Sequence, residues 1–179
     1  QQVLATIQHS SNKLMKLTDD ILSHASKAYA IEEEKQQFDF ATLVQDVLNM
    51  HPQKAEVKLK VFATEKNIYS YKKILAQVLA NLMDNAIVHN SKRGKLIEVK
   101  LTHEKWHYKI EVKDNGNGIP FENLRKIFDI FYVGDDAKQE EHSGVGLATV
   151  KQLTQKLGGK VDVLSDEGDG STFTFTVRR

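Results

Sequence analysis

The chain lacks cysteine entirely and has only two prolines in 179 residues. The missing cysteine excludes disulfide bonds, thiolate zinc sites and cysteine nucleophiles. Charge of one sign is also lacking, because 25 basic and 24 acidic residues leave a formal net charge of +1. Nucleic-acid-binding proteins usually carry a strong basic excess. No apolar run approaches the ~18 residues of a membrane span. We therefore expect no nucleic-acid partner and no membrane contact by this chain.

The composition is that of a globular protein, with 40% hydrophobic and 27% charged residues. From Val3 to about Glu34, apolar residues recur at helical spacing without glycine or proline. A helix of about 30 residues is about 45 Å long, too long to pack wholly on a small domain. We interpret residues 1–34 as one helix of a hairpin or coiled-coil seam; a helix lying along its own domain is the alternative. The first residue is Gln, so we expect a fragment of a longer protein.

Residues 35–179 are predicted to form one globular domain in which helical and strand patterns alternate. Strands are expected at residues 38–40, 57–63, 96–101, 106–112, 161–164 and 172–177. Helices are expected at residues 41–50, 74–89, 121–131 and 146–157. Helices interleave with strands, and the last strands form hairpins. This order predicts an α+β fold, a two-layer α/β sandwich with one mixed sheet and helices on one face.

Five short segments carry the chemistry, and their order is more informative than any one of them. They are Asn81–Ala86, Asp114–Pro120, Ile127–Tyr132, Ser143–Ala148 and Gly168–Phe173. Together they resemble the N, first glycine, F, second glycine and third glycine boxes of the ATP-binding domain of sensor histidine kinases. That domain belongs to the GHKL group, with gyrase-type, MutL-type and heat-shock chaperone ATPases. The resemblance covers about residues 38–177 and implies the histidine-kinase type of ATPase sandwich, with ATP and Mg²⁺ as cofactors.

Asn81 and Asn85 are four residues apart and share one helix face. We expect that face to lie opposite most of the apolar residues of the same helix. Amide oxygens are hard ligands that suit Mg²⁺. The resemblance implies that Asn85 ligates the magnesium bridging the nucleotide phosphates, with Asn81 close to the phosphates. In an arbitrary helix, two such residues would simply be solvated amides.

Asp114 ends a strand and enters a glycine-rich loop. A carboxylate there can accept a hydrogen bond from the exocyclic amine of adenine, and the resemblance implies this role. Gly116 and Gly118 let the backbone approach the base without a Cβ clash. Ser171 matches the hydroxyl that supports the adenine-reading Asp in the family, and Thr172 is the weaker candidate. An Asp that merely caps a turn is the plain alternative.

Gly144, Val145, Gly146 and Leu147 precede or open a helix, where free backbone N–H groups and the helix dipole favour phosphate. The polar segment Val133–Ser143 corresponds to the family's ATP lid. We expect Phe128 and Phe131 to be hydrophobic anchors for the hinge of that lid.

The phosphate end departs from the family pattern. Val88, Val133 and His142 stand where the family usually has a basic residue, a basic residue and a glycine. The lid is also acidic, with four carboxylates against one lysine. Asn81, Asn85, Val88 and Lys92 are predicted to lie on one helical stripe, so Lys92 or the adjacent Arg93 could supply the missing phosphate contact. Two solvated turn residues are the equally weighted alternative.

The reaction type follows from Asn81. ATP-hydrolysing members of the group carry a Glu there as general base, and an amide takes no proton at neutral pH. The expected function is the catalytic part of a two-component sensor histidine kinase. It would transfer the γ-phosphoryl group of MgATP to a His outside this fragment.

The N-terminal segment fits that reading. Residues 14–22 are similar to the second helix of the family's dimerisation and phosphoacceptor hairpin. Neither His9 nor His24 stands in a phosphoacceptor box, so we expect no autophosphorylation of this fragment. The implied partners are a second copy in a homodimer and a response-regulator receiver domain. The expected location is cytoplasmic, with any membrane anchor elsewhere in the full-length protein.

Two other functions stay open. One is a degenerate nucleotide-sensing or scaffolding module without kinase activity, favoured by Val88, Val133 and the acidic lid. The other, weaker one is a serine kinase acting on an anti-sigma partner, which gives no reason for the N-terminal helix.

Overall fold

The structure is a computed structural model that describes residues 33–134 and 144–179. The long helix expected at residues 1–34 therefore lies almost wholly outside the described residues, as does most of the expected lid. The first described residue, Glu33, leads within a few residues into the folded domain. In the described parts of the chain, no helix is both long and apolar enough to cross a membrane.

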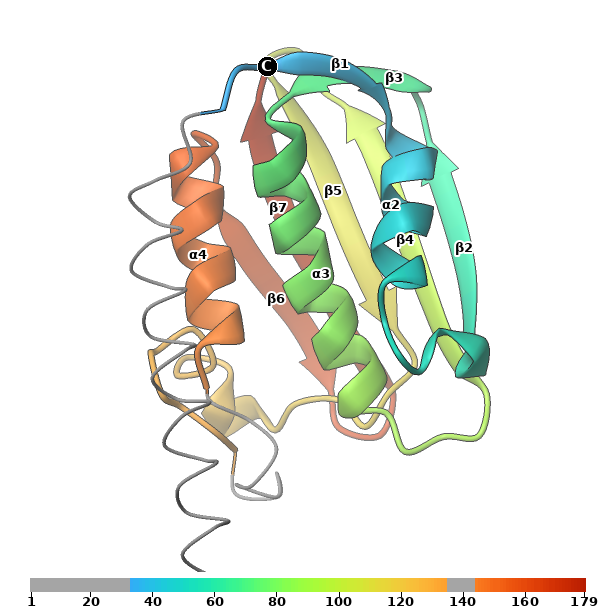
Figure 1. Ribbon diagram of the computed structural model, residues 1–179. Coiled ribbons are helices and arrows are strands. Elements are labelled where there is room, and N and C mark those ends of the chain that lie inside the picture. Colours follow the sequence, from blue (N-terminus) through green and yellow to red (C-terminus); the bar gives the residue numbers. More distant parts are fainter. Residues whose placement is uncertain (1–32, 135–143) are drawn as a thin grey trace, which may run out of the picture.

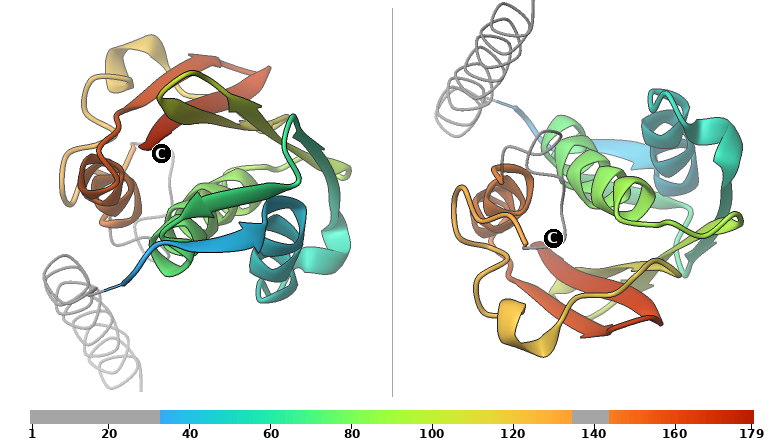
Figure 2. Two further views of the ribbon diagram at one scale, coloured as in Figure 1. Left: turned by 90° about the horizontal axis from the view of Figure 1, so that it is seen from above. Right: turned by 90° about the horizontal axis from the view of Figure 1, so that it is seen from below.

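A five-stranded mixed sheet forms one layer of the domain, and helices α2 (Phe40–Asn49), α3 (Lys72–Val88) and α4 (Gly146–Lys156) form the other (Figures 1 and 2). The strand order is β2 (Val57–Ala63), β4 (Lys95–His103), β5 (His107–Asp114), β7 (Gly170–Arg178) and β6 (Val161–Asp166). Strand β2 is parallel to β4, and the other neighbours are antiparallel. The predicted two-layer α/β sandwich is confirmed.

A second, two-stranded sheet joins β1 (Gln36–Asp39) to β3 (Asn67–Ser70), antiparallel. The strand expected at residues 38–40 is thus shifted, because Asp39 ends it and caps α2 by accepting from the Thr42 N–H at 2.9 Å. Strand β3 was not predicted from the sequence. It is only four residues long, and Ile68 is its one buried apolar side chain, so no alternation marks it.

The core lies between the two layers and is built on alternation in the central strands. Residues on the inner face of β4, β5 and β7 are buried, and they include Ile97, Val99, Leu101, Tyr108, Ile110, Val112, Phe173, Phe175 and Val177. Helix α3 packs against them with Leu75, Val78, Leu79 and Leu82 fully or almost fully buried. Burying each side chain of this size contributes about 1.5–3 kcal/mol. The outer face is charged, with Lys60 and Glu98 paired at 2.6 Å.

Helix α3 is capped from a distant part of the chain. Its own N-cap residue, Tyr71, makes no side-chain cap. The carboxylate of Glu33 instead accepts from the Lys73 N–H at 2.8 and 3.0 Å and from the Ile74 N–H at 3.2 Å. A carboxylate satisfies the free N–H groups of a helix start and interacts favourably with the helix dipole.

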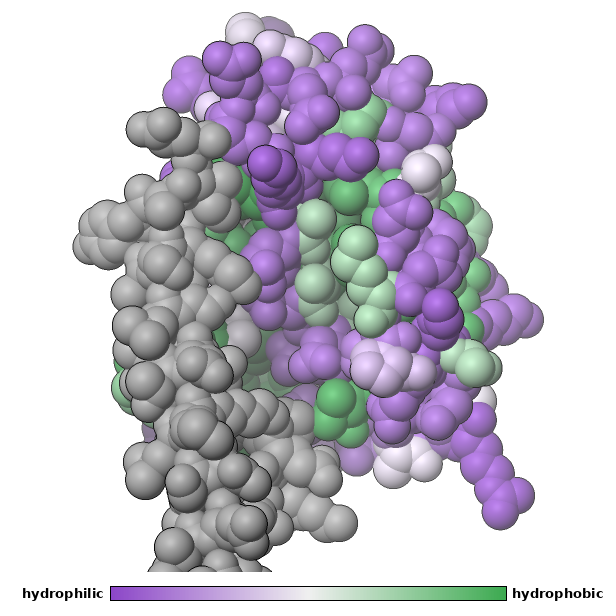
Figure 3. Space-filling view, in the orientation of Figure 1, coloured by the Kyte–Doolittle hydropathy of each residue, from purple (hydrophilic) through white to green (hydrophobic). Residues whose placement is uncertain are grey.

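Hydrophilic side chains dominate the upper part of the helical layer in Figure 3, with more hydrophobic ones over its middle.

The helix predicted at residues 121–131 is wrong. The structure has one 3-10 turn, η2 (Phe121–Asn123), followed by further turns. The apolar spacing that suggested a helix includes Ile130 and Phe131, which are 49% and 51% exposed and form no buried face. A second 3-10 turn, η1 (Lys54–Glu56), follows α2. The other predicted helices and strands of the domain are confirmed, with ends that differ by a few residues.

Candidate functional site

Four segments that carry the predicted site residues end or begin at one end of the sandwich. They are the C-terminus of α3, the end of β5, the turn between β6 and β7, and the N-terminus of α4 (Figure 1). The antiparallel register places Lys113 opposite Thr172, so the end of β5 adjoins the start of β7. Residues that are far apart in the sequence are thereby brought together.

Asp114 is the most strongly positioned of the predicted residues. Its side chain is buried, and Oδ1 accepts hydrogen bonds from the backbone N–H of Gly116 at 2.7 Å and of Ser171 at 3.3 Å. Burial raises the pKa of Asp114, while these two N–H groups and the nearby Lys92 cation lower it and offset part of the effect. Within the described residues, Oδ2 accepts no hydrogen bond, so this oxygen is available to a ligand.

Ser171 supports Asp114 through its backbone and not through its hydroxyl. The Ser171 Oγ lies 2.9 Å from the Oγ of Ser165. Ser165 in turn accepts from the Ile119 N–H at 2.8 Å and donates to the Gly170 carbonyl at 2.9 Å. Ser165 thus joins the loop after β5 to the β6–β7 turn. No sequence pattern predicts this role, because a single serine within a strand pattern is common.

The structure does not bring Thr172 to Asp114. Side chains alternate between the two faces of a strand. Phe173 and Phe175 point into the core, so Thr172 lies on the outer face of β7, and the buried Asp114 is on the inner face with Ile110 and Val112. Thr172 therefore does not belong with the residues that surround the Asp114 side chain.

The loop after β5 approaches the β6–β7 turn at Gly118. This residue has a φ of +73°, and a Cβ there would lie 2.1 Å from the carbonyl oxygen of Asp166. Both the backbone conformation and the close approach require glycine. At Gly116 a Cβ would lie 2.8 Å from the Oδ1 of Asp114. The two glycines predicted for the base side hence let the loop close around the carboxylate.

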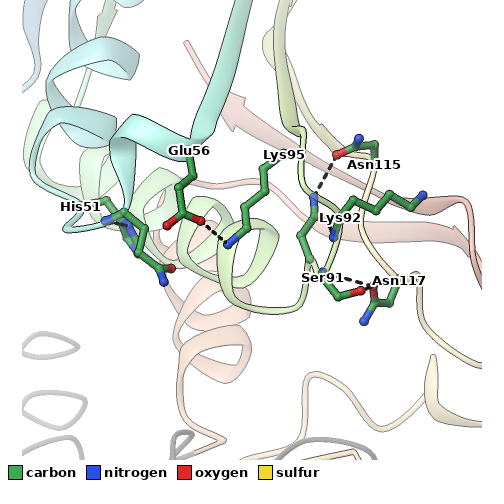
Figure 4. Close-up of polar contacts among 9 residues, drawn as sticks. His51, Glu56, Ser91, Lys92, Lys95, Asn115 and Asn117 are labelled. Carbon is green, nitrogen blue, oxygen red and sulfur yellow. Dashed lines mark hydrogen bonds and ion pairs between the residues drawn. The ribbon is translucent and has the colours of Figure 1, made fainter.

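An asparagine network that the sequence did not reveal holds these loops in place (Figure 4). The buried Asn90 donates from Nδ2 to the Oδ1 of Asn115 at 2.9 Å. Asn115 also accepts from the Leu96 N–H at 2.8 Å and donates to the Gly94 carbonyl at 2.9 Å. The Oδ1 of Asn117 accepts from the Ser91 hydroxyl at 2.8 Å. The loop after α3 and the loop after β5 are therefore joined by several side-chain hydrogen bonds.

Lys92 is not where the helical stripe was expected to put it. Helix α3 ends at Val88, so the stripe through Asn81 and Asn85 does not reach residue 92. The Lys92 amine donates to the Gly168 carbonyl at 2.9 Å, in the turn that precedes Ser171. Arg93 is exposed. The structure thus places Lys92 beside the Asp114 end of the site.

Asn81 and Asn85 do share one side of α3, but at the border of its apolar face and not opposite to it. Both residues are half-buried, and both Nδ2 atoms are buried without a hydrogen-bond partner among the described residues. A buried amide without a partner costs free energy. Phosphate oxygens would accept from these nitrogens, and the amide oxygens suit a hard cation. The pair therefore fits a magnesium-bound phosphate group.

The N-terminus of α4 presents backbone N–H groups without a side-chain cap. Val145 is buried and Leu147 packs against the core, so their contribution to a ligand would come from the backbone. A Cβ at Gly146 would have open space around it. Gly144 has a φ of +66°, and a Cβ there would lie 2.6 Å from the carbonyl carbon of Phe131. The backbone at position 144 therefore requires glycine.

The hinge of the predicted lid is a backbone contact. The Phe131 N–H donates to the Gly144 carbonyl at 2.9 Å, which joins the two sides of the segment 135–143. Phe128 packs on the core, with its ring 6.4 Å from that of Phe173 in an edge-on arrangement. Phe131 is 51% exposed and has a φ of +66°. Its predicted role as a hydrophobic anchor for the lid stays a prediction, because most of that segment lies outside the described residues.

Two of the curated proteins that the chain is similar to are bacterial sensor proteins. The aerobic respiration control sensor protein ArcB of Escherichia coli (strain K12) is 29% identical over 188 residues, which cover 99% of this chain and 24% of ArcB. Sensor histidine kinase WalK of Bacillus subtilis (strain 168) is 30% identical over 183 residues, which cover 97% of this chain and 30% of WalK. The chain therefore spans about a quarter to a third of the length of these relatives.

Solved structures share the fold. A mycobacterial sensor histidine kinase, MprB, matches with a TM-score of 0.70 and 23% identity over 80% of this chain and 97% of that one. Full-length ShkA in complex with AMPPNP matches with a TM-score of 0.76 and 24% identity over 98% of this chain and 38% of ShkA. The family described as "Histidine kinase-, DNA gyrase B-, and HSP90-like ATPase" matches residues 71–179, more than half of the sequence. The chain belongs to this family of ATPases.

Proposed function

We propose that this chain is the catalytic ATP-binding part of a two-component sensor histidine kinase. The observation that carries the proposal is the pairing of two unlike groups at one end of the sandwich. A buried carboxylate, Asp114, keeps one oxygen available, and the amides of Asn81 and Asn85 are buried without partners among the described residues. Both sequence relatives described above are sensor proteins, and WalK is a sensor histidine kinase.

The proposed nucleotide lies with its base at Asp114 and its phosphates toward α3 and α4. The free Oδ2 of Asp114 accepts from the exocyclic amine of adenine, and Gly116 and Gly118 give the base access. The backbone N–H groups of Gly146 and Leu147 and the amides of Asn81 and Asn85 face the phosphates. In this proposal Gly144 shapes the hinge, and Ser171 holds Asp114 through its backbone N–H.

Magnesium would be held by Asn85 together with the phosphates themselves. In the described parts of the chain, no group of three or more His, Asp or Glu side chains could hold a metal ion alone. When bound, the ion neutralises charge on the phosphates. The remaining work of the site is positioning, since the amide of Asn81 cannot act as a general base for water. In the proposed transfer, the unprotonated nitrogen of the acceptor imidazole forms a bond to the γ-phosphorus as the bond from that phosphorus to the oxygen of ADP breaks. The other ring nitrogen then loses its proton to water or to a base.

The test uses this chain together with a separately purified phosphoacceptor hairpin of a sensor histidine kinase. With γ-labelled MgATP we expect acid-labile phosphohistidine on the hairpin and none on His9 or His24. Label on His9 or His24, or release of inorganic phosphate without an acceptor, would contradict the proposal. Dimerisation through residues 1–34, a receiver-domain partner and a cytoplasmic location belong to the same proposal and follow only from the resemblance.

A degenerate nucleotide-sensing module is the second candidate, and one observation favours it. Val88 supplies no cation at the phosphate end, and the Lys92 amine is bonded to the Gly168 carbonyl instead. Such a module would bind ADP at least as tightly as ATP and give no label transfer. Calorimetric titration with both nucleotides separates the two functions.

A further inference from the structure

Lys92 bridges two of the loops that surround Asp114. Its backbone N–H donates to the Oδ1 of the buried Asn90 at 3.0 Å, so the residue is fixed at its base. Its amine donates to the Gly168 carbonyl at 2.9 Å, 76 residues further along the chain. The contact therefore ties the loop after α3 to the β6–β7 turn.

The same turn is held from the other side by the loop after β5. The Gly168 N–H donates to the Asn117 carbonyl at 2.6 Å, and the Asn117 N–H donates to the His89 carbonyl at 3.3 Å. Gly168 has a φ of +90° and no protein atom within 4 Å of where a Cβ would lie, so packing does not fix it. Hydrogen bonds at both its N–H and its carbonyl do.

This turn leads directly into the residue that orients Asp114. Two residues after Gly168, Gly170 begins β7, and a Cβ on Gly170 would lie 2.2 Å from the Asp114 carbonyl oxygen. The next residue, Ser171, donates its N–H to the Oδ1 of Asp114 at 3.3 Å. A shift of the β6–β7 turn would therefore move the N–H group that holds the Asp114 carboxylate.

We propose that Lys92 is a positioning residue of the adenine end of the site, and not a phosphate contact. It fixes the β6–β7 turn so that the N–H of Ser171 holds Asp114 with Oδ2 toward the base. This inference rests on the proposed binding of an adenine nucleotide. It also gives Lys92 an electrostatic role, because its cation favours the ionised carboxylate that accepts from the base.

The test compares three variants with the parent protein. Lys92→Met removes the donor and the charge at similar length, and Lys92→Arg retains both. Lys58→Met is the matched control, because it removes one cation from an exposed position on β2, the edge strand at the far side of the sheet. Thermal unfolding of each variant confirms that the domain is folded before binding is measured.

Titration with adenosine, ADP and ATP locates the effect. We expect Lys92→Met to weaken all three by the same factor, roughly 3- to 10-fold, which is the effect of one lost hydrogen bond. Lys92→Arg should recover most of the affinity, and Lys58→Met should match the parent. A loss for ATP without a loss for adenosine would make Lys92 a phosphate contact and overturn the inference, as would unchanged affinity for all three.

Two further measurements follow the two steps of the inference, from Lys92 to the turn and from Lys92 to the Asp114 carboxylate. Without the cation the pKa of Asp114 rises further, so adenosine binding is lost at a higher pH on acidification than in the parent. Lys92 is the one charged side chain found to act on Asp114 within the described residues. In the ligand-free protein, amide hydrogen exchange at residues 168–171 should become faster in Lys92→Met and stay unchanged in Lys58→Met.

These results separate the inference from the proposed function. If the parent binds no adenine nucleotide, the proposed function fails. If the parent binds ATP but Lys92→Met leaves both the exchange rates and the acid limb unchanged, only the role of Lys92 fails.

Discussion

The base end and the phosphate end of the site differ in what satisfies their polar groups. At the base end, Asp114 is held by two backbone N–H groups, and an asparagine network joins the surrounding loops. At the phosphate end, the amide nitrogens of Asn81 and Asn85 are buried without partners within the described residues, and α4 begins without a side-chain cap. The protein itself holds the carboxylate at the first end in place and leaves only its Oδ2 without a partner, whereas at the second end the proposed ligand would supply the partners of both amides.

This difference assigns separate tasks to the two ends. In the proposed function, a pre-organised base end costs little ordering when the nucleotide binds, so we expect it to set selectivity for adenine. The phosphate end gains most of its hydrogen bonds on binding, so its affinity depends on magnesium, on salt and on the charge of nearby side chains. Variants at each end should consequently be told apart by the ligand whose affinity they change.

The largest effect is expected for Asp114→Asn at the base end. A hydrogen bond to a charged group contributes about 1.5–3 kcal/mol, so affinity for adenosine, ADP and ATP should fall about 10- to 100-fold. Burial raises the pKa of Asp114, which means that the ionised carboxylate destabilises the fold near neutral pH. The neutral Asn should therefore leave the unfolding midpoint unchanged or higher. Titration calorimetry with a circular-dichroism control measures both, and unchanged affinity in a folded variant would refute the assignment.

A smaller and conditional effect is expected for Asn85→Ala at the phosphate end. Affinity for ATP should fall about 10-fold with Mg²⁺ present, the effect of losing roughly one charge-assisted contact. With a chelator present the loss should be much smaller. Gln77→Ala, two turns earlier on α3, is the control. If the loss is the same with and without Mg²⁺, Asn85 is not the magnesium ligand.

Val88→Lys should have a still smaller effect, and of opposite sign. Val88 is the last residue of α3, one turn beyond Asn85 on the same side. A lysine there restores the cation that the family usually has near the phosphates. We expect ATP affinity to rise about 3-fold at low salt, because a partly exposed ion pair contributes ~1 kcal/mol or less. Adenosine affinity should not change. A gain for adenosine would mean that the two ends are not separable.

The sequence was sufficient for the parts of the site that sit on regular elements. The i, i+4 spacing of Asn81 and Asn85 and the strand-end position of Asp114 both follow from local pattern and from the order of the glycine boxes. The sequence was insufficient where a contact depends on how two loops pack against each other. Such contacts include the hydrogen bond from Asn90 to Asn115 and the one from Lys92 to Gly168. The misjudged segment 121–131 shows the same limit, because helical spacing of apolar residues cannot tell whether a face is buried.

The cap on α3 is another long-range contact, and it connects the phosphate end to the start of the domain. Glu33 lies at the C-terminal end of residues 1–34, the segment interpreted as the long helix, and accepts three hydrogen bonds from the N-terminus of α3. That helix carries both site amides, so the phosphate end should respond to Glu33 and the base end should not.

Glu33→Gln keeps an acceptor but loses the charge that favours a helix N-terminus, so the free energy of unfolding should fall by about 0.3–1 kcal/mol. Glu34→Gln is the matched control, since Glu34 is exposed and its substitution changes the net charge by the same amount. Urea unfolding measures the difference between the two variants, and equal stabilities would show that the charge of the cap contributes nothing. A loss of ATP affinity in Glu33→Gln, with adenosine affinity unchanged, would show that the cap also supports Asn81 and Asn85. An equal loss for both ligands would show instead that α3 responds as a whole and that the two ends are coupled through it.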